Sequence, residues 1–138
     1  MVEREPLCAE RIRKITGGFA FIEHRFLRDG FFQSLSRHEL LLYFFLVLVG
    51  DRLGLSYYSY DKICTLLRFT LDEYLLARDG LIGKDLVAFD GHLYQVLSLP
   101  SRADRGEPKP LKTKEEISQR DPATVRRIIL DSLGGGHG

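Results

Sequence analysis

Residues 59–99 read SYDKICTLLRFTLDEYLLARDGLIGKDLVAFDGHLYQVLSL and contain most of the information about the fold. Ser59 is a good N-cap for a helix that runs through Leu67, because a serine side chain can accept a hydrogen bond from an unpaired amide of the first turn. Ile63, Leu66 and Leu67 have the spacing of a buried helical stripe. The opening of this stretch therefore predicts a helix of about two turns that packs on one face.

A tight turn at Arg68-Phe69 separates this helix from a longer one. Thr70 and Glu73 have the spacing of a capping box, in which each side chain accepts a hydrogen bond from the other residue's amide. The box predicts a helix that begins here and ends near Lys84. Its inward-facing residues are expected to be Leu71, Leu75, Arg78 (through its stem), Leu81 and Ile82.

Two β-rich runs follow, Leu86–Phe89 and His92–Leu97, with Asp90-Gly91 between them. Asp-Gly between such runs is a strong hairpin signal, because a type I′ turn needs positive φ at both central residues. The stretch therefore ends in a predicted two-stranded hairpin.

Shorter elements are predicted on both sides of the long apolar run described next. Phe19–Ile22 reads as a short strand, and His24–Leu27 as a helical turn ended by Asp29-Gly30. Leu55–Tyr58 reads as another short strand, because aromatic and aliphatic residues favour the extended backbone.

Residues 40–49, LLLYFFLVLV, form the longest apolar run. Ser36 and Glu39 form a second capping box ahead of it, so a helix is expected from there to about Gly50. The run is apolar on every face, whereas a surface helix needs only one apolar stripe. This helix is therefore expected to be covered on both sides.

The aromatic residues mark the extent of the domain. All nine Phe and six Tyr lie between Phe19 and Tyr94, while the chain after Pro100 has none and is rich in charge. Such a segment cannot build a core of its own. The sequence predicts five parts: a basic N-terminal arm (1–18), a folded domain (19–99), a linker (100–120), a C-terminal amphipathic helix (121–133) and a disordered tail (134–138).

Composition excludes several classes of protein. Twenty basic and nineteen acidic residues give a net charge of +1, which excludes a histone-like protein and an acidic disordered one. The ten-residue apolar run is half the length of a membrane span, and MVEREPLCAE lacks the apolar stretch of a signal peptide. Cys8 and Cys64 have neither metal nor redox spacing. A cytoplasmic protein is expected, nucleoid-associated if it binds DNA.

Helix, short strand, helix, tight turn, helix and hairpin is the order of a winged helix-turn-helix, which residues 59–99 resemble. Gly80-Leu81-Ile82 followed by Leu86-Val87 matches the family pattern in which a helix leads straight into the wing. Residues 19–49 resemble the opening of bacterial replication-initiator and DnaD-type winged helices. The implied fold is α+β, mainly α, with a small β-hairpin wing and an extra N-terminal strand and helix.

The resemblance implies double-stranded DNA as the partner, for a small regulator or an accessory factor of replication or a mobile element. In such folds the third helix enters the major groove and the wing touches neighbouring backbone. Carried over by position, the DNA-binding residues are Ser59, Tyr60, Lys62, Arg68, Thr70, Asp72, Glu73, Leu76, Arg78 and His92.

The charge of the folded domain differs from that of a typical DNA-binding domain, which is basic. The third helix is acidic, with Asp72, Glu73 and Asp79, whereas phosphates supply most non-specific affinity through basic contacts. Residues 29–99 hold six basic and nine acidic groups, net −3, while residues 1–28 hold six and four, net +2. Arg13 and Lys14 in the arm are therefore expected to supplement the domain, since such arms reach into minor grooves.

A dimeric protein-interaction winged helix, acting as a scaffold without direct DNA readout, is the alternative. The apolar helix offers more surface than one side of a small domain needs, and a homodimer would cover it. A C-terminal helix with one apolar stripe could dock there too, in the same chain or on a protein partner. The interface residues are expected to be Phe44, Phe45, Val47 and Leu48, with Val125, Ile128, Ile129 and Leu133.

Enzyme chemistry is not expected. His24, His38, His92 and His137 are scattered and have no carboxylate or cysteine partner at ligand spacing. No phosphate-binding loop of the GxxxxGK[ST] type is present. The sequence therefore predicts no catalytic residue, no metal and no cofactor.

Overall fold

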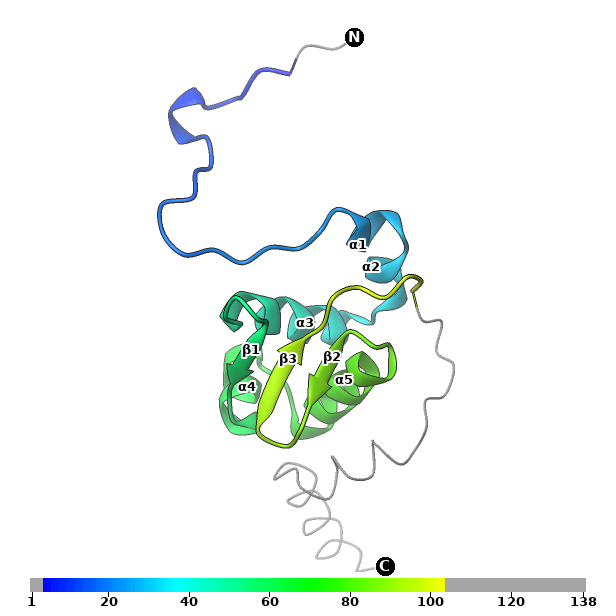
Figure 1. The fold of residues 1–138 in the computed structure, drawn as a ribbon. Helices are drawn as coiled ribbons and strands as arrows, with labels where there is room; N and C mark the ends of the chain where they lie inside the picture. Colours follow the sequence, from blue (N-terminus) through cyan, green and yellow to red (C-terminus); the bar gives the residue numbers. More distant parts are fainter. Residues whose placement is uncertain (1–3, 104–138) are drawn as a thin grey trace, which may run out of the picture.

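Hydroxyl caps begin the three longest helices in the structure, a computed structural model that describes residues 4–103 (Figure 1). Each cap side chain accepts a hydrogen bond from an amide in the first turn of its helix. Both predicted capping boxes are confirmed, because the glutamate at the third position also binds the cap's own amide. The helices and their caps are α3 (Arg37–Val49, Ser36), α4 (Tyr60–Leu67, Ser59) and α5 (Leu71–Gly83, Thr70).

A three-stranded antiparallel sheet joins the strand ahead of α4 to the hairpin after α5. Its strands are β1 (Leu55–Tyr57), β2 (Val87–Phe89) and β3 (Leu93–Val96), in the order β1-β3-β2. The predicted hairpin is confirmed, and β1 pairs along the other side of β3. Figure 1 shows β3 between the other two strands, with the hairpin turn at one end of the sheet.

The hairpin turn differs from the predicted one. Phe89 pairs with Tyr94, so the central residues of the turn are Gly91 and His92. Gly91 has φ +102°, whereas neither His92 nor Asp90 is among the residues with positive φ. Positive φ at the first central position only is the pattern of a type II′ turn. The type I′ prediction was wrong by one residue, because the Asp90 carboxylate accepts hydrogen bonds from the amides that follow it.

The core lies where α3 and α5 pack on each other and against the sheet. Leu42 and Leu46 of α3, and Leu81 of α5, are completely buried. Tyr74 and Tyr94 are buried beside them, and their hydroxyls form a hydrogen bond between α5 and β3. Leu66, predicted to be buried in α4, is exposed because only one narrow face of α4 meets the core.

Two single-turn helices, α1 (Arg25–Arg28) and α2 (Phe31–Ser34), precede α3. Gly30 between them has φ +89°, a left-handed conformation that glycine adopts without steric cost. The predicted helical turn and its end at Asp29-Gly30 are confirmed. Phe26 of α1 stacks on Tyr43 of α3 with ring centroids 4.9 Å apart, which anchors the pair of turns to the core.

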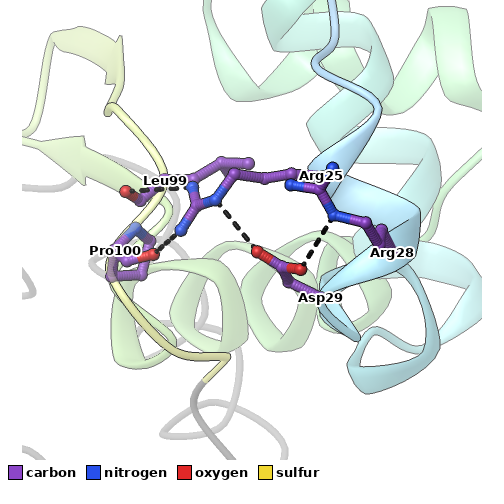
Figure 2. A network of polar contacts seen from close by, with 5 residues as sticks. All are labelled: Arg25, Arg28, Asp29, Leu99 and Pro100. Carbon is purple, nitrogen blue, oxygen red and sulfur yellow. Dashed lines mark hydrogen bonds and ion pairs between the residues drawn. The ribbon is translucent and has the colours of Figure 1, made fainter.

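A polar network connects α1 to the chain that leaves β3 (Figure 2). The Arg25 guanidinium donates to the carbonyl of Leu99 at 3.5 Å and to that of Pro100. Its Nε also bonds Asp29 Oδ2 at 3.1 Å, and Arg28 binds the other oxygen of that carboxylate at 3.3 Å. Both ends of the folded region are thereby held together.

The chain ahead of α1 contributes no buried residue from residue 4 to residue 24, and its one helical turn is η1 (Ala9–Arg11). The strand predicted at Phe19–Ile22 is wrong, since the structure has no strand there. A strand needs a partner edge for its backbone groups, and this stretch has none in the described residues. Phe19 and Phe21 are accordingly 71% and 73% exposed.

The described residues thus form an α+β fold that is mainly helical, with a small three-stranded antiparallel sheet. None of the helices in residues 4–103 has the length and apolar composition that a membrane crossing requires. Most of the predicted linker, the C-terminal helix at 121–133 and the tail at 134–138 lie outside the described residues, and their prediction stands as it was.

Candidate nucleic-acid interface

The turn between α4 and α5 brings a basic side chain to the surface. Arg68 has φ +59°, a left-handed conformation that ends α4. The Phe69 amide then bonds the Cys64 carbonyl at 2.9 Å, and the Phe69 ring is buried. Because Phe69 turns inward, Arg68 is left exposed at the junction of the two helices.

The beginning of α4 lies at the same end of the sheet as the hairpin turn. Tyr57, the last residue of β1, pairs with Leu93, the first residue of β3. The Ser59 hydroxyl is engaged in capping, since it accepts from the Lys62 amide at 3.3 Å. The Lys62 side chain is exposed, with its Nζ 6.0 Å from the centre of the Tyr58 ring. Tyr60, predicted to contact DNA, is half-buried against the core.

His92 is exposed at the hairpin turn, as a wing-tip contact requires, but a carboxylate lies beside it. Asp90 Oδ1 accepts from the Leu93 amide at 2.7 Å and from the His92 amide at 2.9 Å. These two backbone hydrogen bonds lower the pKa of Asp90 below its ordinary value. The hairpin turn therefore presents a negative charge at neutral pH, and His92 is the only side chain with a nitrogen atom among residues 90–92.

The first turn of α5 already binds a carboxylate, that of Glu73. The Thr70 hydroxyl accepts from the Glu73 amide at 3.1 Å, and Glu73 Oε1 accepts from the Thr70 amide at 2.8 Å. That backbone hydrogen bond is the main reason why the pKa of Glu73 lies below its ordinary value. Glu73 Oε2 also contacts His38 Nε2 of α3 at 3.0 Å. A phosphate at this helix end would meet a fixed carboxylate.

The outward face of α5 is acidic and apolar. Asp72 is exposed, and Leu76 one turn later is 72% exposed. Arg78, predicted to face a DNA groove, is 1% exposed, so this prediction was wrong. Its guanidinium lies over the Phe89 ring at 5.4 Å and bonds Asp79 at 3.0 Å, both of which hold it inside the fold.

The arm also offers exposed cations. Arg13 and Lys14 are exposed in an extended segment ahead of α1. Arg25 and Arg28, which could have added to this basic surface, instead bind Asp29 (Figure 2). Phosphate-binding candidates among the described residues are therefore spread over the arm, the beginning of α4 and the α4–α5 turn.

Some of the residues predicted to form an apolar interface are exposed in the structure, and one is buried. Phe44 and Leu48 of α3 are exposed and Val47 is half-buried, as an interface would need. Phe45 is buried and meets the Tyr58 ring edge-on at 5.2 Å, so its prediction as an interface residue was wrong. Val125, Ile128, Ile129 and Leu133 lie outside the described residues.

Leu41 was missed as an interface candidate. It is exposed and lies one helical turn before Phe44 on the same face. The spacing of residues 41, 44 and 48 along a helix could have identified it. Its neighbours in the run are equally apolar, and the sequence alone does not say which of them point inward.

No group of three or more His, Cys, Asp and Glu side chains in residues 4–103 is arranged to hold a metal ion. A scan of protein-family models finds no match to this chain, and searches of curated proteins and of solved structures find none either.

Proposed function

We propose that this chain is a winged helix-turn-helix protein that binds double-stranded DNA. The observation that carries the proposal is the element order α3-β1-α4-α5-β2-β3, with β1 and the hairpin in one sheet. In helix-turn-helix proteins the second helix of the pair lies in the major groove and the first crosses the backbone. Here α5 and α4 would take these two roles.

Phosphate contacts are assigned to exposed cations on three segments. Lys62 lies in the first turn of α4, Arg68 follows the last residue of α4, and Arg13 and Lys14 lie in the arm. The arm reaches beyond the folded core, as minor-groove arms of other DNA-binding domains do. Four such contacts would give weak, strongly salt-dependent binding.

Base readout by α5 is limited to a few residues. Leu76 is the exposed apolar side chain that could meet a thymine methyl group, and Asp72 could accept from cytosine N4. Glu73 is already bound by the Thr70 amide and His38. Binding dominated by the backbone, with modest sequence preference, follows from this surface. A small regulator or an accessory factor of replication or a mobile element, the role implied by the resemblance, is the proposed context.

The test is fluorescence anisotropy of the full chain with a labelled random duplex, titrated from low to physiological salt. We expect affinity to fall steeply with salt, because each neutralised phosphate adds about 0.9 to the slope of log affinity against log salt. Lys62→Ala with Arg68→Ala should lower that slope by about two and weaken binding at low salt. Arg13→Ala with Lys14→Ala should act in the same direction.

Arg52→Ala is the matched control, since it removes an exposed cation from the other end of the sheet. Arg52 precedes Leu55, which pairs with Gln95, whereas the wing turn adjoins Leu93. An Arg52→Ala effect as large as that of Arg68→Ala would refute the assigned surface. Absence of binding at low salt would refute DNA binding by this protein.

A protein-binding winged helix is the second candidate, favoured by the outward face of α5. That face presents Asp72 and Leu76, and its arginine is buried. Negative charge and an apolar side chain suit a basic, partly apolar protein surface better than a phosphate backbone. A null result in the DNA titration would make this candidate the leading one.

A further inference from the structure

One face of α3 is an apolar stripe left uncovered by the described residues. Leu41, Phe44 and Leu48 are 44%, 56% and 60% exposed, and they lie on one line along the helix. From Leu40 to Val49 the helix has no charged residue. A stripe of large apolar side chains over two turns is the kind of surface that marks an interaction site.

A further exposed aromatic side chain lies on α2, ahead of α3. Phe32 of α2 is 47% exposed, and its ring meets Phe26 edge-on at 6.3 Å. Phe26 in turn stacks on Tyr43 of α3. Phe32 is thus joined to α3 through Phe26 and the buried Tyr43.

We propose that a second copy of this chain occupies the stripe, with the two α3 helices antiparallel about a two-fold axis near Phe44. A two-fold interface needs a patch that is complementary to itself. Leu41 precedes Phe44 by three residues and Leu48 follows it by four. Antiparallel pairing thus places Leu41 of each copy beside Leu48 of the other and brings the two Phe44 rings together.

The charges at the two ends of α3 are complementary in this arrangement. Arg37 is exposed in the first turn, and Asp51 is exposed just after the last. Antiparallel packing brings each Arg37 toward the Asp51 end of the other helix, where the helix dipole also favours a cation. An apolar centre with charged ends is the usual anatomy of a protein interface.

The second copy fits this stripe better than a charged protein partner would. A partner with charged groups opposite Phe44 would have to bury them without a counter-charge, which is costly. A second α3 presents an uncharged face of the same length. This pairing depends on α3 alone and does not require DNA binding.

The test is the molar mass of the full chain by size-exclusion chromatography with light scattering, over about a hundredfold range of concentration. We expect the mass to rise from 15.8 kDa toward twice that value. Phe44→Glu and Leu48→Glu should give the monomer mass throughout, because each would place a carboxylate at the two-fold axis or beside it. Both side chains are exposed in the single chain, so the fold should survive, which circular dichroism checks.

Leu76→Glu is the matched control, since Leu76 is an exposed leucine on another helix, α5, and is 72% exposed against 60% for Leu48. It should leave the mass of the dimer unchanged. A wild-type mass of 15.8 kDa at the highest concentration would overturn the proposal, whether the stripe is then covered by another segment of the same chain or by another protein. A dimer that persists in Phe44→Glu would overturn it as well.

Cross-linking locates the axis independently. Phe44→Cys in a Cys8→Ser background should give a covalent dimer with a short bis-maleimide, because the two residues 44 face each other across the axis. Leu76→Cys in the same background should give much less. Equal yields from the two variants would contradict an axis at Phe44.

Discussion

At the scale of single residues, Gly80 allows α5 to approach the beginning of α3. A Cβ atom at this position would lie 1.8 Å from Glu39 Oε2. Glu39 is held there because its Oε1 accepts from the Ser36 amide at 2.7 Å and from Lys84 Nζ at 2.7 Å. Lys84 Nζ also donates to the Ser34 carbonyl at 2.6 Å. One glycine thus makes room for a carboxylate that binds Lys84 at the end of α5, and Lys84 in turn binds α2.

Gly80→Ala should therefore lower the free energy of unfolding by about 2 kcal/mol, because the added methyl group displaces Glu39 from a half-buried ion pair and from its cap. Urea denaturation measures the change. Gly83→Ala, in the last turn of the same helix with nothing within 4 Å of its added Cβ, is the control. Its stability should stay within about 0.5 kcal/mol of wild type. Equal stability of the two variants would contradict the role given to Gly80.

Asp51 provides a prediction on pH. Its Oδ1 accepts from the Leu55 amide at 3.0 Å and from the Leu53 amide at 2.8 Å, and these bonds lower its pKa below the ordinary value of 3.8. The folded state therefore favours the charged carboxylate. Its contribution to stability is complete above the ordinary pKa and is lost as the pH falls through the lower pKa of the folded state.

Asp51→Asn should therefore reduce the fall in Tm that wild type shows on acidification below about pH 4. The asparagine oxygen can still accept from the two amides, so Tm at neutral pH should change less than the acid dependence does. Thermal unfolding followed by circular dichroism from neutral to acidic pH measures both. An identical acid dependence in the variant and wild type would refute this account of the loop.

At the scale of elements, side-chain caps determine where the helices of the core begin. Thr70 and Ser36 each complete a capping box at a helix that contributes to the core. Without the hydroxyl, the amide of the third helical residue loses its partner. The turn between α4 and α5 depends on such a start, because only Phe69 and Thr70 separate the left-handed Arg68 from the first residue of α5.

Thr70→Ala should lower the free energy of unfolding by about 1 kcal/mol, the usual cost of removing an N-cap. Urea denaturation is again the measurement. Thr65→Ala is the control, since its exposed hydroxyl donates to the Asp61 carbonyl within α4 and caps nothing. A Thr65→Ala effect as large as that of Thr70→Ala would mean that the cap is unimportant.

At the scale of the whole molecule, Arg25 connects parts of the chain that are far apart in sequence. Its guanidinium binds the carbonyls of Leu99 and Pro100 and lies over the Phe31 ring at 5.3 Å (Figure 2). α1 and α2 otherwise attach to the core mainly through Phe26 and Phe31, which are buried. This network therefore fixes α1 to the segment that follows β3.

Arg25→Ala should destabilise the protein by about 1–2 kcal/mol, because two backbone carbonyls and Asp29 lose a charged donor. Arg28→Ala is the matched control: Arg28 is on the same helix and binds the same carboxylate, but its side chain is 72% exposed. Its effect should stay below about 0.5 kcal/mol. Thermal unfolding of wild type and the two variants measures both effects. Equal losses of stability in the two variants would contradict a structural role for the contacts of Arg25 with Leu99 and Pro100.

Much of the fold could be predicted because its signals are local. The capping boxes at Ser36 and Thr70, the tight turn at Arg68 and the two β-rich runs around Asp90-Gly91 each depend on neighbours within a few residues. The candidate site was predicted less well. Lys62, Arg68 and His92 are exposed where DNA contact would need them, whereas Arg78 and Phe45 are buried.

Local signals in the sequence place the starts of α3, α4 and α5 and the two strands of the hairpin, since caps, turns and hydrophobic periodicity act over a turn or two of chain. Which face of an element is covered depends on long-range packing and follows from the folded structure. Phe19–Ile22 has the composition of a strand but finds no edge to pair with among residues 4–103. The run from Leu40 to Val49 is apolar all round, yet Leu41, Phe44 and Leu48 are exposed. Burial depends on what packs opposite a side chain. The groups that cover α3 are Phe26, Tyr58 and α5, and all of them belong to other segments of the chain.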